Sequence, residues 1–271
     1  MNTSEIKKKC CELRADIVEM IVEAGSGHPG GSLSCVEILG CLYFGGIMNL
    51  DEEIAPRDRF ILSKGHAGPA LYAVLAHAGY FHRSELLSLR KYGSILQGHP
   101  DMRKCPGVEV STGSLGQGLS ISCGEALGFK MNGSGETVFT LLGDGECQEG
   151  QVWEAAMFAA HNNLDNLIAV IDYNELQIDG KVEEVMSVGD LRAKFEAFGW
   201  KVLNVDGHNV DELCEVLTES KNDKCGSPKC IIAKTVKGKG VSFMENQAGW
   251  HGKAPKGEEA KTALSEVREA I

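Results

Sequence analysis

The feature that most constrains this 271-residue chain is a strand–helix–strand pattern near its middle. Residues 137–142 and 167–172 are two continuous apolar runs, typical of strands that are buried on both faces of a sheet. Residues 150–162, between the two runs, have the composition of a helix. Parallel strands need such a crossover, and the crossover helix covers the sheet. The sequence therefore predicts an α/β fold, a mostly parallel central sheet with helices on both faces.

Other segments extend this unit along the chain. We expect three more strands, at residues 59–62, 201–205 and 230–235. We expect helices at residues 4–24, 32–44, 67–78, 84–90, 119–130, 190–198 and 210–219. A charged tail covers residues 252–271, with a helix predicted at 258–271. Length alone favours roughly two domains, although single α/β domains of about 250 residues are common. No internal repeat or low-complexity segment is visible, and we predict that residues 1–271 form a single domain.

Charge excludes several classes of protein. The 27 Lys and Arg residues are outnumbered by 38 Asp and Glu residues, which gives a net charge of −11. Such a surface repels a phosphate backbone, so we expect no nucleic-acid partner. We also expect no membrane association, because no apolar run is long enough to span a bilayer. The polar first 14 residues contain no signal peptide, which predicts a cytoplasmic protein whose ten cysteines are reduced.

A candidate cation site follows two neighbouring strands of the predicted sheet. Asp144, between Gly143 and Gly145, directly follows one buried run, and Asn174 follows the next. The carboxyl ends of adjacent parallel strands lie at the same edge of a sheet, where such folds bind ligands. A carboxylate and an amide carbonyl, together with phosphate oxygens, suit Mg²⁺. The alternative is an ordinary Asp turn and an Asn cap, but the position of Asn174 and a following Glu149 favour the cation site.

Four histidines lie in loops rich in glycine or proline, and we expect them to share a pocket. They are His28, His66, His99 and His251. Imidazoles in such a pocket are suited to donating hydrogen bonds to phosphates and hydroxyls and to moving protons near neutral pH. The remaining histidines are expected to have structural roles: His77, His82, His161 and His208.

One apparent motif does not carry its usual function. Residues 25–30, GSGHPG, match the glycine pattern of dinucleotide-binding loops. That pattern requires a preceding strand, whereas here a helix precedes it. We therefore reject NAD binding by this segment.

The motifs together resemble the transketolase family of thiamine-diphosphate enzymes. The diphosphate motif of those enzymes is GDG followed by a more distant Asn, and here it reads GDGECQEG (143–150) and DYNELQIDG (172–180). Five further segments resemble transketolase in the same order: GSGHPGG (25–31), RDRFILSKGH (57–66), QGHP (97–100), STGSLGQG (111–118) and TVKGKGVSF (235–243).

The resemblance implies thiamine diphosphate and Mg²⁺ as cofactors, with Ca²⁺ as a substitute metal. Asp144, Asn174 and the backbone carbonyl of Leu176 would bind the metal. The residues implied in cofactor binding are His66, Gly113, Ser114, Leu115, Gly143, Asp144, Gly145, Glu146, Asn174 and His251. The catalytic residues that would face the sugar hydroxyls are His28, His66, His99 and His251. Glu149 resembles a glutamate that lies near the family's dimer axis.

The length of the chain differs from that of the family. Full transketolases have three domains in a chain more than twice as long, and only the first domain is recognisable here. This implies the N-terminal subunit of a split transketolase. We expect the partner to be a C-terminal transketolase subunit, which carries the pyrimidine-binding and C-terminal domains, within a heterotetramer.

The implied reaction transfers a two-carbon ketol unit from a ketose phosphate to an aldose phosphate, with the pentose phosphate pathway as the default context. Two alternatives stay open. One is a subunit of a 1-deoxyxylulose-phosphate synthase-like enzyme, and the other is a non-catalytic assembly half.

Overall fold

A computed structural model describes residues 1–51 and 55–270 and contains a five-stranded sheet in the order β1-β2-β3-β7-β6. Every neighbouring pair in this sheet is parallel. The strands are β1 (Arg59–Leu62), β2 (Val138–Gly143), β3 (Leu167–Tyr173), β6 (Lys201–Asp206) and β7 (Lys229–Lys234). All five predicted strands are therefore present, with ends that differ by at most one residue.

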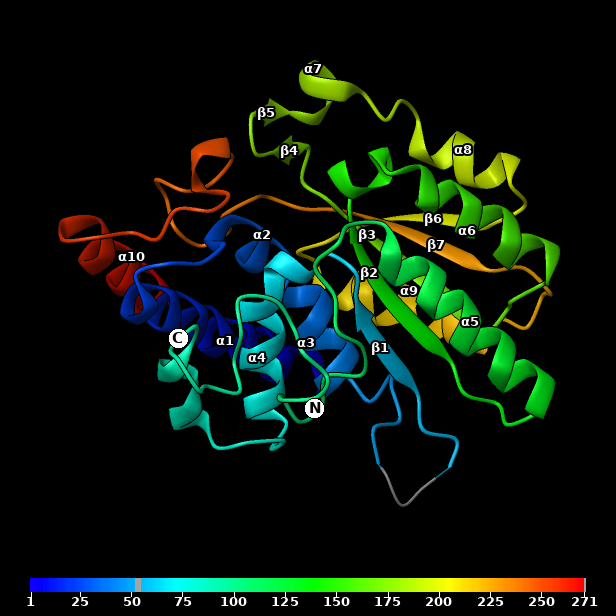
Figure 1. Ribbon diagram of the computed structural model, residues 1–271, viewed down its shortest axis with the longest axis horizontal. Helices are drawn as coiled ribbons and strands as arrows, with labels where there is room; N and C mark the ends of the chain where they lie inside the picture. The colour runs from blue at the N-terminus through cyan, green and yellow to red at the C-terminus, as the bar shows by residue number, and fades with distance from the viewer. Residues whose placement is uncertain (52–54, 271) are drawn as a thin grey trace.

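Side chains alternate between the two faces of the sheet and build two separate cores. On β1, for example, Phe60 and Leu62 point into one core and Ile61 into the other. The first core also contains side chains from α1 (Thr3–Ala24), α3 (Val36–Phe44), α4 (Gly68–His77) and α9 (Val210–Asn222). The second contains side chains from α5 (Gln117–Asn132), α6 (Gly150–His161) and α8 (Leu191–Ala197). Helices thus cover both faces, which confirms the predicted fold class (Figure 1).

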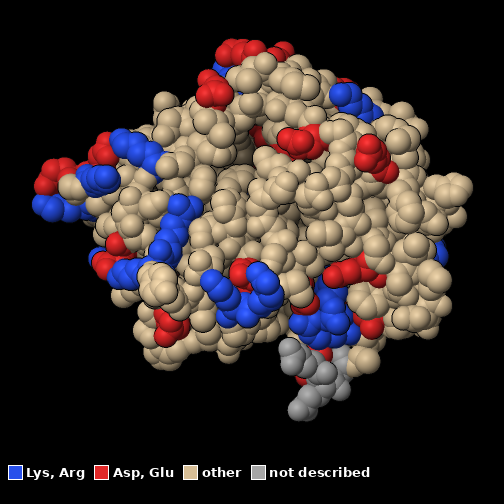
Figure 2. All heavy atoms as spheres, in the orientation of Figure 1, with Lys and Arg blue, Asp and Glu red and all other residues tan. Residues whose placement is uncertain are grey.

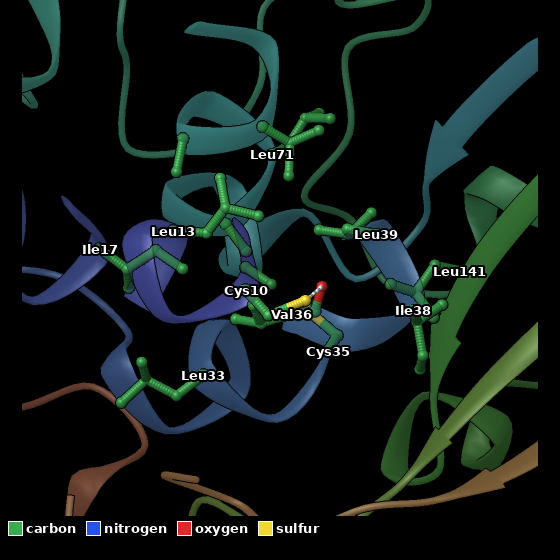
Figure 3. Close-up of a cluster of buried hydrophobic side chains, with 14 of the residues drawn as sticks. Cys10, Leu13, Ile17, Leu33, Cys35, Val36, Ile38, Leu39, Leu71 and Leu141 are labelled. Atoms are coloured by element: carbon green, nitrogen blue, oxygen red, sulfur yellow. Dashed lines mark hydrogen bonds between the residues drawn. The ribbon is translucent and has the colours of Figure 1, made fainter. Parts of the chain in front are cut away.

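The first core is closely packed around α1. Figure 3 shows Leu13 of α1, Leu39 of α3, Leu71 of α4 and Leu141 of β2 in one apolar cluster. Apart from Leu71, which is 3% exposed, these side chains have no measurable solvent exposure. This core holds α3 and the preceding helix α2 (Pro29–Ser34) in place, and His28 directly precedes α2.

Two predicted helices differ from the structure in a way that matters for the site. The helix expected at 32–44 is two helices, α2 (Pro29–Ser34) and α3, which meet at Cys35. The first begins directly after His28 because Pro29 suits the first turn of a helix, where its missing N–H costs nothing. The helix expected at 67–78 begins as a 3₁₀ turn, η1 (Gly65–Ala67), which holds His66.

Several smaller elements complete the chain. The helix expected at 84–90 is the 3₁₀ helix η2 (Arg83–Ser88), and the tail forms α10 (Glu258–Glu269), which packs on α1. Residue 271 of the predicted tail and single domain lies outside the described residues, as do residues 52–54. The elements not predicted are η3 (Gly145–Gln148), β4 (Leu176–Gln177), β5 (Gly180–Lys181), α7 (Val182–Met186) and η4 (Ala248–Trp250).

Two further findings concern membrane-spanning helices and disulfide bonds. Within the described ranges, we find no helix with the length and apolar character that crossing a membrane requires. All ten cysteines lie in the described part of the chain and are free thiols.

Candidate active site

The loops that follow β1, β2, β3 and β7 leave the sheet along the same edge. The register pairs Gly143 with Asp172 and Tyr173 with Lys234. The residues that follow the ends of β2, β3 and β7 are therefore neighbours. This edge is where parallel sheets place their ligand sites. Most of the predicted site residues lie on these loops.

Asp144 directly follows β2 and is 2% exposed. Its Oδ1 accepts a hydrogen bond from the N–H of Gly145 at 2.7 Å, and its Oδ2 accepts one from the N–H of Glu175. Burial, reinforced by the nearby Asp172 carboxylate, raises the pKa of Asp144 to about 6. A buried carboxylate that lacks sufficient positive charge is a favourable ligand for a divalent cation.

Asn174 follows β3 and is oriented by Asp172, which is completely buried. The amide Nδ2 of Asn174 donates to Asp172 Oδ2 at 3.2 Å, and its Oδ1 accepts from the N–H of Leu176 at 3.2 Å. Asp172 also accepts hydrogen bonds from Lys64, Ser34 and Thr235. Although burial opposes ionisation, the Lys64 ammonium and these donors hold the pKa of Asp172 below its usual value.

Lys237 joins the predicted metal loop to the histidines. Its Nζ donates to the carbonyl of Leu176 at 2.8 Å and lies 2.9 Å from Nδ1 of His251. Burial, with repulsion from Lys64, lowers the pKa of Lys237 to about 8. The Leu176 carbonyl, a predicted metal ligand, therefore already has one positive charge beside it, the ammonium of Lys237.

The chemistry of these groups suits a metal that is shared with a phosphate ligand. In residues 1–51 and 55–270, no group of three or more His, Cys, Asp or Glu side chains is arranged to hold a metal ion. A cation at Asp144 and Asn174 must therefore use mixed oxygen ligands and complete its shell with phosphate and water. Mg²⁺ is bound in this way at phosphate sites, so the residues fit the metal that the resemblance implies.

The four predicted histidines lie together at the same edge of the sheet. The ring centre of His28 is 5.5 Å from that of His66, 5.6 Å from that of His251 and 6.2 Å from that of His99. The rings of His66 and His251 are stacked, with centres 5.1 Å apart. We refer to His28, His66, His99 and His251 as the histidine pocket.

The histidine pocket holds its rings in the neutral form. Burial is the main cause, and it lowers the pKa of His28 to about 4 and that of His251 to about 3. Burial, followed by the charge of Lys64, holds the pKa of His66 well below its usual value. Neutral rings donate through one nitrogen and accept through the other. The pocket of the free chain therefore offers hydrogen bonds at neutral pH rather than imidazolium charge.

Three of the predicted cofactor-binding residues, Gly113, Ser114 and Leu115, follow one another in a loop that meets the histidine pocket at Gly113. A Cβ at Gly113 would lie 3.0 Å from the His99 ring, and its φ of +146° favours glycine. Ser114 is exposed and Leu115 is half-buried. Glycine at 113 therefore lets this loop approach His99 closely.

Glu146 lies beneath the loops of the site. Its Oε1 accepts from the N–H of Gly116 at 2.9 Å and from the hydroxyl of Ser63, and its Oε2 accepts from the N–H of Gly143 at 3.0 Å. The side chain is 3% exposed. The structure thus gives this predicted cofactor residue a supporting position that ties three site loops together.

Glu149 lies at the surface, at the start of α6. It is exposed, and its Cβ is 2.9 Å from the position that a Cβ on Gly116 would take. Its location at the protein surface is compatible with the interface role that the resemblance implies.

Three buried residues of the site, Lys64, Asp172 and Lys237, were given no role from the sequence. Lys64 and Lys237 lie within recognised motifs, and each is almost completely buried in a chain of strong net negative charge. The sequence does show that each lysine closely follows an apolar strand. It does not show which residue each lysine contacts, because the partners are distant in sequence: Lys64 and Asp172 are 108 positions apart.

Comparison with known proteins assigns the family. Residues 6–267 match the family described as transketolase, thiamine diphosphate binding domain. The 6-deoxy-6-sulfo-D-fructose transketolase subunit SqwG of Clostridium sp. (strain MSTE9) is 45% identical over 258 residues, covering 94% of this chain and 93% of that protein. An apulose-4-phosphate transketolase subunit of Phocaeicola vulgatus is 43% identical over 263 residues, covering 95% and 92%.

Longer relatives match only in part of their length. Human transketolase is 41% identical over 269 residues, which cover 98% of this chain and 42% of that protein. The crystal structure of transketolase from Campylobacter jejuni superposes with a TM-score of 0.90 at 33% identity, covering 99% of this chain and 43% of that one. The chain therefore spans less than half of these transketolases, but nearly all of the two transketolase subunits.

These findings confirm the predicted resemblance, fold class and enzyme class. The two subunits of similar length agree with the prediction of a split enzyme that transfers ketol groups. This chain belongs to the transketolase family, and it corresponds to the thiamine diphosphate binding domain of that family.

Proposed function

We propose that residues 1–271 form a single domain that holds the diphosphate and metal half of a two-chain transketolase. The observation that carries this proposal is Lys237, whose ammonium contacts both the Leu176 carbonyl of the metal loop and His251 of the histidine pocket. The Lys237 ammonium thus bridges the candidate metal site and the histidine pocket. A phosphorylated cofactor fits the metal site, and a sugar fits the histidine pocket beside it.

In this proposal Asp144, Asn174 and the Leu176 carbonyl hold Mg²⁺ or, as a substitute, Ca²⁺. Gly143, Gly145, Lys237 and the loop at residues 113–115 face the cofactor. When bound, thiamine diphosphate supplies the nucleophilic carbon and the electron sink that breaking a carbon–carbon bond beside a carbonyl requires. The chain itself contributes binding energy, orientation and a largely buried pocket.

The histidine pocket orients the substrate in this proposal. His28, His66, His99 and His251 offer ring nitrogens to ketose and aldose hydroxyls; Nδ1 of His28 and of His251 already contacts Arg90 and Lys237, so these two rings offer Nε2. Fixed neutral imidazoles of this kind align a polyhydroxylated substrate and pass protons between its oxygens and the pocket. Phosphorylated ketoses and aldoses are the proposed substrates, in the pentose phosphate pathway or in the breakdown of a specialised sugar.

The decisive experiment measures ketol transfer by the chain copurified with its companion subunit. We expect transfer from a ketose phosphate to an aldose phosphate, with an absolute requirement for thiamine diphosphate and a divalent cation. The matched control is the same complex carrying Asp144→Ala. Equal activity in both complexes would support the non-catalytic assembly role, and condensation of pyruvate with an aldose phosphate would support the 1-deoxyxylulose-phosphate synthase-like reading.

A surface over α5 and α6 supports the proposed C-terminal partner. Ile121, Met157 and Phe158 are exposed there, and a Cβ on Gly124 or Gly128 would meet no atom within 4 Å. Figure 2 shows this area as largely uncharged, with charged side chains in separate groups around it. Exposed apolar surface of this kind is typical of protein–protein contacts. We place the partner contact of the proposed heterotetramer here, beside Glu149, in the cytoplasm.

The Phe158→Glu variant is expected to weaken association with the companion subunit by roughly 10-fold or more. Burying a carboxylate in an apolar contact costs more than the lost ring alone. Sedimentation or light scattering across a dilution series measures the effect. Leu87→Glu is the matched control, because Leu87 is 44% exposed against 43% for Phe158 but lies on η2, which packs on α1 and α4. Equal association by both variants would place the contact elsewhere.

A further inference from the structure

Arg90 lies at the rim of the histidine pocket and has no part in the function proposed above. Its Nη1 donates to the hydroxyl of Ser26 at 2.8 Å. Its Nη2 lies 3.2 Å from Nδ1 of His28 and 3.5 Å from the carbonyl oxygen of Gly98. A Cβ on Gly98 would lie 3.4 Å from the guanidinium carbon, so the group packs closely against the backbone there.

The conformation of Arg90 shows that the surrounding structure fixes it firmly. Its φ is +62°, in the left-handed region that is unfavourable for a side chain other than glycine. Among the residues that the structure describes, Arg90 makes no ion pair, and its three contacts are all to neutral groups. A partly buried guanidinium without a carboxylate costs desolvation energy. Carboxylates are plentiful in a chain of charge −11, yet the contacts of this guanidinium are to neutral groups.

Other histidines of the chain have the opposite kind of neighbour. Nε2 of His77 lies 2.8 Å from Asp16, and Nδ1 of His208 lies 2.9 Å from Glu37. The ring of His28 instead lies beside a guanidinium, and a neighbouring cation favours the neutral form of an imidazole.

The contact with Arg90 also determines which nitrogen of His28 holds the proton. A guanidinium only donates hydrogen bonds, so Nδ1 of His28 must accept, and the single proton of the neutral ring is on Nε2. Within the described part of the chain, Nε2 has no hydrogen-bond partner. Its neighbour is Gly252, where a Cβ would come within 3.6 Å. The Nε2–H is thus available to a ligand oxygen.

We propose that Arg90 is a positioning residue, which keeps His28 neutral and oriented so that its Nε2–H is presented to a substrate hydroxyl. The hydroxyl ligand rests on the proposed transketolase function, whereas the state of the ring is a property of the chain alone. The charged and titratable groups that face His28 are Arg90, His99, Lys237, His66 and His251. Burial comes first and Arg90 second among the causes that lower the pKa of His28.

Nuclear magnetic resonance of the full chain, with ¹⁵N-labelled histidine and no cofactor, tests the state of the ring. His28→Gln identifies the His28 signals. We expect a bare Nδ1 and a protonated Nε2 in the wild type, with the ring still neutral at pH 5. In Arg90→Met we expect the pKa of His28 to rise by about 1 unit or more, because the neighbouring cation is gone. Lys91→Met removes the same charge one position away, from a lysine that pairs with Glu23, and should leave His28 unchanged.

Activity of the complex with the companion subunit supplies the second measurement. Arg90→Met should lower kcat/KM roughly 10-fold or more. It should also move the acid limb of the kcat/KM–pH profile to higher pH, because His28 then becomes protonated at a higher pH. Arg90→Lys keeps the charge and should restore the acid limb. A proton on Nδ1 in the wild type, or an unchanged His28 titration in Arg90→Met, would overturn the proposal. The expected His28 titration together with a complex that shows no ketol transfer would instead overturn the proposed function alone.

Discussion

The Asp144→Asn variant of the assembled enzyme is expected to lose at least about 10²-fold of its ketol-transfer rate. Loss of a residue that merely orients a metal ligand typically costs 10- to 100-fold, and Asp144 is the only carboxylate among the proposed ligands. The amide keeps the shape but removes the negative charge, and its single oxygen can accept from only one of the N–H groups of Gly145 and Glu175. We therefore expect weaker cation binding, with a folding change of about one backbone hydrogen bond.

Initial rates at increasing Mg²⁺ concentration measure this effect. The variant should need much more Mg²⁺ for half-maximal rate, and high Mg²⁺ should restore part of the activity. Asp206→Asn is a suitable control, because Asp206 also ends a strand of the sheet. That strand is β6, an edge strand separated from β2 by β3 and β7. A wild-type Mg²⁺ dependence in Asp144→Asn would show that the cation is held elsewhere.

The Lys64→Met variant is expected to lower the free energy of unfolding by about 3–5 kcal/mol. The side chains of Lys64 and Asp172 are 1% and 0% exposed, so the variant leaves a carboxylate buried without its counter-charge. The remaining donors, Ser34, Thr235 and Asn174, stabilise that carboxylate only in part. Lys64 also donates to the carbonyl of Gly31 at 2.9 Å, so the start of α2 loses a contact as well.

Chemical denaturation of the full chain measures this loss. Removing both charges, in Lys64→Met with Asp172→Asn, should be less destabilising than the sum of the single changes, since no unpaired charge is then left. The exposed pair of Lys181 and Glu184 provides the control: its side chains are 64% and 67% exposed, and Lys181→Met should leave the unfolding curve nearly unchanged. Additive single changes at Lys64 and Asp172 would contradict the coupling described here.

The strands and the candidate metal residues were predictable from the sequence for a common reason. Buried parallel strands need continuous apolar runs, and β2 and β3 carry such runs almost from end to end. The turn residues Asp144 and Asn174 then follow directly, so their positions at one edge of the sheet require no knowledge of the rest of the fold.

The groups that adjust the charge of the site were not predictable in the same way. Lys237 acts through contacts with Leu176 and His251, and Arg90 acts through His28, 62 positions earlier. Such contacts depend on how loops from distant parts of the chain meet, which local pattern does not reveal. The start of α2 at Pro29 was missed for a different reason, because the glycines around it mask the beginning of a helix.

The most direct test of the account is calorimetric titration of thiamine diphosphate into the complex of this chain with its companion subunit. With Mg²⁺ present, we predict saturable binding to the wild-type complex, and binding that is lost or greatly weakened in Asp144→Asn. The chain alone should bind far more weakly than the complex. Binding of equal strength to the wild-type and Asp144→Asn complexes, or no binding to a correctly assembled wild-type complex, would contradict the claim that this chain holds the cofactor's diphosphate and metal.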